Sequence, residues 1–202
     1  MHIETKRLVI RTFQIADIDA LEKIKYDPEV VHFIPDFIER GADRERFLKA
    51  ILDFQAIEKR GDWDAWRLYA IEARDTGCVV GSLSFGKSEM LYEYELGWQM
   101  QSCFSGKGYA SEAAEAFSEY FCKEQGTDYL IAIMDTDNPA SYRTAEKSGF
   151  KLFEKRTVHD PSCGKFFDDY YYFRRYFSGS KIAYKFYGDA PYTGRGAEPG
   201  DL

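Results

Sequence analysis

The sequence predicts a mixed α/β (α+β) fold in which a single central sheet is flanked by helices. Short runs rich in β-branched and aromatic residues alternate between apolar and polar positions, and longer segments with apolar residues at helical spacing lie between them. The chain has 202 residues, 45% of them apolar, which suffices for one core but not comfortably for two. We expect one domain over residues 1–177 and a tail over 178–202, where glycine and proline interrupt any periodic pattern.

The first third of the chain predicts a strand followed by two helices. Residues 7–13 alternate as a strand does, and residues 17–24 then show helical spacing that stops before Asp27 and Pro28. Residues 43–59 predict a second helix, which Gly61 closes. The segment that begins Val31-His32-Phe33-Ile34-Pro35 is expected to be an apolar loop between the helices.

A hairpin and a further strand follow. Residues 66–73 and 79–85 are β-rich and flank an Asp-Thr-Gly turn, and residues 92–100 continue the sheet. Side chains alternate along a strand, so Glu93, Glu95 and Gly97 are expected on one face and apolar residues on the other. We therefore expect one face of this strand to pack into the core and the other to line a polar site.

The remaining elements alternate between helix and strand up to the tail. Ala110, Ala113, Phe117 and Phe121 form one apolar stripe, which indicates an amphipathic helix over 110–124. The later predictions are a strand over 129–134, a helix over 138–148, a strand after Gly149 and a last strand over 169–176.

Charge and composition exclude several classes of function. The formal net charge of -7 and the pI near 5.1 argue against nucleic acid as a partner, because such binding depends on basic side chains. No apolar run approaches the roughly 18 residues of a membrane span, so we expect a cytoplasmic protein with no membrane partner. The four cysteines and three histidines are scattered, which predicts free thiols and no metal site.

One glycine-containing loop has the features of an anion site. Residues 105–110 read Ser-Gly-Lys-Gly-Tyr-Ala and lie between a predicted strand and a predicted helix, where glycines and unpaired N–H groups favour phosphate. A P-loop would need glycine at Gln101 and serine or threonine at Gly108. A dinucleotide fingerprint would need glycine at Ser111. Both of those nucleotide-binding interpretations fail.

Three further motifs support the interpretation of this loop as a binding site. Residues 138–150 read N-P-A-S-Y-R-T-A-E-K-S-G-F, residues 5–11 read T-K-R-L-V-I-R, and residues 95–98 read E-L-G-W. Together these motifs resemble the GNAT superfamily of N-acetyltransferases, and the branch that contains the ribosomal-protein N-terminal alanine acetyltransferases (RimJ/RimL-like). The resemblance covers residues 3–176.

The resemblance implies a splayed mixed sheet with acetyl-CoA in a gap beside the strand at 92–100. The pyrophosphate would rest on the backbone of the loop, which comprises Gly106, Lys107, Gly108, Tyr109 and Ala110. Cys103 stands where the family pattern has Gln or Arg, so no side-chain contact is expected there. Lys107 is either a point charge for a phosphate or a solvated loop residue.

The resemblance also assigns roles in acetyl transfer. Asn138 would contact the pantetheine arm, although Asn followed by Pro is also a strong start for a helix. A backbone N–H near Met100 would bind the oxyanion. Many members of the family protonate the departing thiolate with a tyrosine seven residues after this asparagine, but that position is Ala145 here. Ser141 is the remaining candidate, because Tyr142 would point to another face.

The acceptor side is the least determined part of the sequence. Glu95 is the candidate base, either through a water or as an anchor for the substrate ammonium, and Glu93 competes with it as a substrate contact. Phe33 and Trp66 are candidate substrate contacts, as are Trp63 and the stretch 165–170. A peptide N-terminus, an amino acid, a polyamine and a drug-like amine all stay open as acceptors.

Two further questions stay open. A CoA-binding sensor or scaffold that has lost turnover is the alternative to an enzyme that acts through a direct ternary complex, because Cys103 and Ala145 depart from the family pattern. The aromatic-rich region 166–177 also leaves a homodimer open.

Overall fold

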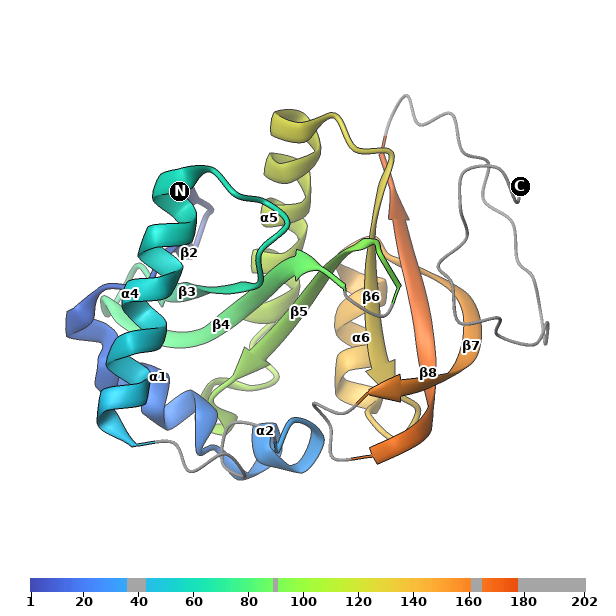
Figure 1. The fold of residues 1–202 in the computed structure, drawn as a ribbon, viewed down its shortest axis with the longest axis horizontal. Helices are drawn as coiled ribbons and strands as arrows, with labels where there is room; N and C mark the ends of the chain where they lie inside the picture. The colour runs from blue at the N-terminus through green and yellow to red at the C-terminus, as the bar shows by residue number, and fades with distance from the viewer. Residues whose placement is uncertain (36–42, 89–90, 161–164, 178–202) are drawn as a thin grey trace.

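A computed structural model describes residues 1–35, 43–88, 91–160 and 165–177 (Figure 1). Its centre is a sheet of eight strands in the order β1-β2-β3-β4-β5-β6-β8-β7. Neighbouring strands are antiparallel except β5 and β6, which are parallel. The strands are β1 (His2–Glu4), β2 (Leu8–Thr12), β3 (Arg67–Ala73), β4 (Cys78–Lys87), β5 (Tyr94–Met100), β6 (Tyr129–Asp135), β7 (Lys151–Asp160) and β8 (Lys165–Tyr176).

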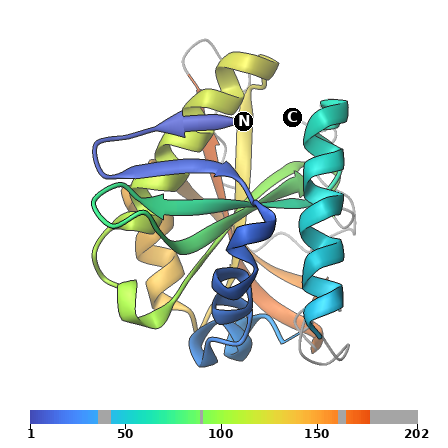
Figure 2. The same cartoon turned by 90° about the vertical axis from the view of Figure 1, so that its left-hand side faces the viewer.

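Helices cover both faces of the sheet, so the predicted fold class is confirmed. Figure 2 shows the sheet between α5 and α4. One face packs Phe85 of β4 against Phe117 and Phe121 of α5, and the other packs Leu68 of β3 with Leu21 and Phe47. The helical elements are η1 (Ile15–Asp17), α1 (Ile18–Lys25), α2 (Pro28–Phe33), α4 (Arg44–Arg60), η2 (Ser102–Phe104), α5 (Tyr109–Gln125) and α6 (Pro139–Lys147).

The expected apolar loop after the first helix was partly wrong. Residues 28–33 form α2, with Pro28 at its first position. The Asp27 side chain accepts a hydrogen bond from the N–H of Glu29 at 3.1 Å, as the N-cap of a helix does. The pair Asp27-Pro28 therefore begins a new helix as well as ending α1.

The strand predicted over 92–100 begins later, at Tyr94. Tyr92 has a φ of 57°, which lies outside the range of a strand. The N–H of Ser88 donates to the Glu93 carbonyl at 2.8 Å, so Glu93 belongs to the turn that leads into β5. The alternation of side chains between the two faces of the sheet, expected over 92–100, therefore begins at Tyr94 and does not include Glu93.

The sheet is splayed between β5 and β6. These strands pair at a single register position, Glu95 opposite Ile131, whereas β4 and β5 pair from Tyr94 to Met100. Toward its carboxyl end β5 therefore keeps β4 as its neighbour and diverges from β6. The tail predicted over 178–202 lies outside the described residues, so that domain boundary stays a prediction.

Candidate active site

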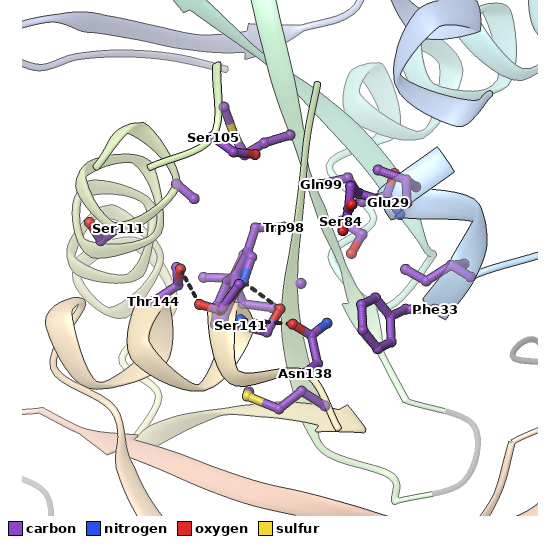
Figure 3. Close-up of a pocket in the computed structure, with 18 of the residues that line it drawn as sticks. Glu29, Phe33, Ser84, Trp98, Gln99, Ser105, Ser111, Asn138, Ser141 and Thr144 are labelled. Carbon is purple, nitrogen blue, oxygen red and sulfur yellow. Dashed lines mark hydrogen bonds between the residues drawn. The ribbon is translucent and has the colours of Figure 1, made fainter. Parts of the chain in front are cut away.

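A cavity of about 1040 Å³ passes through the sheet where β5 and β6 diverge. Its walls include residues 97–100 of β5 and 133–135 of β6. Figure 3 shows Ser141 and Thr144 on the α6 side of the cavity, and Glu29 and Phe33 on the α2 side. The cavity therefore connects the two faces of the sheet.

The predicted anion loop forms one end of this cavity. Gly106 and Gly108 both have a φ of 76°, a left-handed conformation that glycine adopts without strain. Gly108 is also the N-cap of α5, and its carbonyl accepts a hydrogen bond from the Ser111 hydroxyl at 3.1 Å. The unpaired N–H groups of a helix N-terminus lie beside the cavity, an arrangement that suits a phosphate group.

Asn138 and Ser141 lie at the start of α6 and line the same cavity. The Asn138 side chain accepts a hydrogen bond from the Ser141 N–H at 3.0 Å, so it caps α6. The indole N–H of Trp98 donates to the Ser141 hydroxyl oxygen at 3.2 Å. Because this hydroxyl accepts from Trp98, its own proton is available to another acceptor in the cavity.

The backbone of β5 also presents a donor to the divergence. The N–H of Gln101 donates to the Val80 carbonyl at 3.1 Å, on the β4 side. Successive N–H groups of a strand point to opposite edges, so the Met100 N–H is directed toward β6. Since β6 pairs with β5 only at Glu95, this N–H points into the gap rather than into a ladder.

Two glycines shape the α2 side of the cavity around Glu95. A β-carbon on Gly86, which pairs with Glu95 across the sheet, would lie 2.9 Å from Cγ of Trp66. A β-carbon on Gly97 would overlap the hydroxyl oxygen of Ser84. Trp66 and Ser84 therefore fill the space of the missing side chains on either side of Glu95, and all three line the cavity.

The first turn of α2 is tied to the end of β5. One Asp27 oxygen caps α2, and the other accepts from the Ser102 N–H at 2.7 Å. Asp27 is 8% exposed, so these bonds are largely sheltered from water. They fix α2, which carries Glu29 and Phe33, relative to the strand that ends at the anion loop.

Sequence comparison agrees with this geometry. A family model described as an acetyltransferase (GNAT) domain matches residues 7–151 of the chain. The chain belongs to the GNAT acetyltransferase family. Acetyl-CoA-dependent acetylation is the general reaction of that family.

Several relatives of this GNAT protein share most of its length. The uncharacterised N-acetyltransferase YnaD of Bacillus subtilis (strain 168) is 33% identical over 174 residues, which are 85% of this chain and 95% of YnaD. A GNAT acetyltransferase from Bacillus anthracis superposes with a TM-score of 0.70 at 28% identity, covering 87% of this chain and 98% of that one. RimL, a ribosomal L7/L12 α-N-protein acetyltransferase solved with coenzyme A, superposes with a TM-score of 0.72 at 18% identity, covering 87% of this chain and 98% of RimL. At this identity the likeness is one of fold.

Most site residues predicted from the GNAT resemblance line the cavity. Lys107 is an exception, because its Nζ lies 5.0 Å from the centre of the Phe104 ring and it is not in the cavity wall. The predicted residues that do line the wall are Phe33, Trp66, Glu95, Met100, Gly106, Gly108, Tyr109, Ala110, Asn138 and Ser141.

Glu93 as a substrate contact was wrong. Its side chain is buried and accepts hydrogen bonds from the hydroxyls of Tyr129 at 2.7 Å and Tyr172 at 2.6 Å. The prediction that Trp63 contacts the substrate was also wrong, because Trp63 packs against Phe85 and Phe121 in the core under α5. Of the stretch 165–170, Tyr170 lines the cavity.

Ala145 stands where many members of the family have a tyrosine. Ala145 is fully buried in the core beneath α6, so no hydroxyl reaches the cavity from that position. Tyr142 packs edge-on against Tyr171 and Phe173, with ring centres 5.1 Å and 5.0 Å apart. Its ring therefore points away from the cavity, as the sequence predicted.

Trp98, Ser84 and Asp27 contribute to the site although the sequence predicted no role in it for them. Trp98 belongs to the predicted core face of its strand, and only the fold brings it to Ser141.

In the described ranges, no helix is long and apolar enough to cross a membrane. No group of three or more His, Cys, Asp or Glu side chains in those ranges is placed to hold a metal ion.

Proposed function

We propose that this GNAT protein transfers an acetyl group from acetyl-CoA directly to a primary amine in a ternary complex. The observation that carries the proposal is the continuous cavity, with a helix N-terminus on one side of the sheet and Glu95, Trp66 and Ser84 on the other. A donor bound from one face and an acceptor bound from the other would meet at the divergence of β5 and β6. Such proximity supplies a large part of the rate enhancement in a direct transfer.

The donor side of the cavity suits coenzyme A. The pyrophosphate would bind the backbone N–H groups at residues 106–110, where the α5 dipole favours negative charge. The Asn138 carbonyl oxygen caps α6, which leaves its side-chain NH₂ group to donate to the pantetheine arm. Under this proposal Asn138 caps α6 and also contacts the pantetheine arm.

The acyl group would react at the end of β5. The amine nitrogen attacks the thioester carbon, the Met100 N–H donates to the oxyanion, and the carbon–sulfur bond then breaks. The Ser141 hydroxyl, which accepts from Trp98 at 3.2 Å, donates its proton toward the departing sulfur. The attacking nitrogen loses its second proton to solvent as the intermediate collapses, and Ser141 recovers a proton from solvent.

The acceptor side suits an amine that arrives as an ammonium ion. Glu95 takes the proton that the ammonium loses, directly or through one water. The Trp66 indole lies in the space beside Glu95 that Gly86 leaves open, and an indole face attracts a cation. Ser84 supplies a hydroxyl on the other side of Glu95.

Two acceptor classes fit this site. RimL acts on the N-terminus of ribosomal protein L7/L12, and its fold is shared here, which supports a protein N-terminus. The aromatic side chains of Phe33, Phe54 and Trp66 in the wall suit a small amine with an apolar group equally well. The alternative of a catalytically weak CoA sensor rests on Ala145, which places no hydroxyl in the cavity.

Isothermal titration with acetyl-CoA, with ATP and NAD as controls, tests the donor site. Selective binding of acetyl-CoA, lost in Gly108→Trp, supports the proposal, and its absence refutes it. Release of free CoA thiol is then measured with a panel of amino-terminal peptides, polyamines and arylalkylamines. Tight CoA binding without thiol release from any of them favours the sensor.

A further inference from the structure

The first turn of α5 contains a carboxylate where an anion site should exclude one. Glu112 lies in the turn that begins at Tyr109, directly after the proposed pyrophosphate loop. Negative charge in the first turn of a helix normally occupies the same positive end of the dipole that a phosphate would use. A glutamate there would compete with coenzyme A unless another group neutralised it.

The N-terminal segment neutralises this carboxylate. The Thr5 hydroxyl donates to one Glu112 oxygen at 2.6 Å, and the Arg7 N–H donates to the same oxygen at 3.0 Å. The Arg7 guanidinium donates through Nε to the other oxygen at 2.6 Å. The Glu112 side chain is 20% exposed, so it faces Thr5 and Arg7 rather than solvent or cavity.

The same guanidinium holds the loop. Nη1 of Arg7 donates to the carbonyl of Lys107 at 2.9 Å, across 100 residues of sequence. The Arg7 guanidinium carbon, Cζ, lies 4.8 Å from the centre of the Tyr109 ring. Nη2 of Arg7 would lie 3.5 Å from a β-carbon on Gly108. Arg7 thus contacts Lys107 and Tyr109 and lies beside Gly108, the three consecutive residues at which the loop becomes a helix.

We infer that Thr5, Arg7 and Glu112 form a brace that fixes the backbone of residues 106–110 for the pyrophosphate of acetyl-CoA. Arg7 and Glu112 are positioning residues, because neither lines the cavity. Gly106 and Gly108 give the loop more conformational freedom than other residues would, and the brace removes that freedom before the ligand arrives. The inference rests on the proposed donor site.

The brace and simple electrostatics predict opposite effects for Glu112→Ala. Removal of a negative charge beside a bound pyrophosphate should tighten binding if charge alone mattered. Loss of the brace should instead weaken acetyl-CoA binding by about tenfold, a magnitude typical of groups that orient a binding site. Arg7→Lys keeps the charge but cannot bind Glu112 and the Lys107 carbonyl as one planar fork does, so it should weaken binding similarly.

Titration calorimetry of the full chain with acetyl-CoA tests this inference, with Glu119→Ala as the matched control. Glu119 lies in the C-terminal half of the same helix, away from the loop, and pairs with Arg175 at 3.1 Å. Thermal melting confirms that each variant is folded at the titration temperature. Thr5→Val removes a single hydroxyl and serves as a milder variant if the other two unfold.

A second ligand separates positioning from general loosening of the fold. S-acetylpantetheine has the acyl arm but no pyrophosphate, and its weak binding is followed by NMR titration. The brace predicts that Glu112→Ala and Arg7→Lys weaken acetyl-CoA alone, and that the double variant is no worse than either single one. Equal weakening of both ligands, or unchanged acetyl-CoA affinity in the two variants, overturns the brace. Failure of the wild type to bind acetyl-CoA instead refutes the proposed function itself.

Discussion

Arg174 and Glu93 form an ion pair in the interior of the protein, with 3.2 Å between Nη2 and Oε1. Arg174 is 1% exposed and Glu93 is 8% exposed. The same glutamate oxygen accepts from Tyr129 of β6 and Tyr172 of β8. The pair therefore joins the start of β5 to β6 and β8, next to the single position at which β5 and β6 pair.

We predict that Glu93→Gln lowers the free energy of unfolding by about 3 kcal/mol or more, because it leaves the Arg174 charge buried without a counterion. Unfolding in urea, followed by circular dichroism, measures the effect. Arg44→Gln is the control, since Arg44 is 61% exposed and pairs with Asp19 at 2.7 Å; exposed pairs contribute less than about 1 kcal/mol. A Glu93→Gln variant as stable as this control would contradict the interior role.

The elements that sequence predicted well are those determined by local patterns. The helix over 43–59 is α4, and Gly61 caps it as predicted, in a left-handed conformation with a φ of 66°. The hairpin of β3 and β4 and the helix after Gly108 also follow from periodicity and turn residues. Apolar spacing and caps act within a few residues, so one sequence suffices to find them.

The parts that sequence missed depend on strand register and on contacts between distant segments. Nothing near Gly86 in sequence shows that Trp66 fills the space of its missing side chain, because that contact depends on the register of β3 and β4, which shifts between Ile71 and Glu72. The Arg7–Glu112 pair likewise spans 105 residues. Glu93 was misplaced because the strand, with its side chains on alternate faces, was predicted to begin at Tyr92. The φ of 57° at Tyr92 is incompatible with a strand, and β5 begins only at Tyr94.

Gly97→Ala should destabilise the protein, because the new methyl group would overlap the Ser84 hydroxyl. We expect a loss of about 1–3 kcal/mol from this overpacking. Ser84→Gly in the same chain removes the obstacle and should restore part of the stability. Thermal melting of the two single variants and the double variant gives the coupling, and strictly additive effects would show that the two side chains do not compete for this space.

Ser141→Ala should lower the turnover number while leaving the affinity for acetyl-CoA within about twofold, because the lost hydroxyl acts in the transition state. General acid catalysis contributes about 10²–10⁴-fold, so a reduction of at least tenfold is expected. Trp98→Phe removes the indole donor to Ser141 and should have a smaller effect in the same direction. Stopped-assay thiol release with the best amine measures both, and an unchanged rate in Ser141→Ala would exclude the thiolate role.

The pH dependence of stability should report the Thr5–Glu112 bond. Partial burial alone would raise the pKa of Glu112, but hydrogen bonds from Thr5 and Arg7 and the charge of Arg7 lower it below its ordinary value of 4.5. A carboxyl whose pKa is lower in the folded state stabilises the fold above its unfolded pKa. That stabilisation is lost as pH falls from about 4.5 toward the folded pKa.

Thr5→Val removes one of these donors and should raise the folded pKa of Glu112 toward 4.5. The contribution of Glu112 above that pH then shrinks, so the difference in stability between wild type and variant should be constant at neutral pH and narrow in acid. Carboxyl carbon NMR measures the pKa, and melting between about pH 3 and pH 6 measures the stability. Asp17 is the internal control: its pKa is lowered, against the effect of burial, by Arg11 and the Gln14 N–H, contacts that Thr5→Val does not alter. A shift at Asp17 equal to that at Glu112 would mean that the substitution disturbs the fold generally rather than this bond.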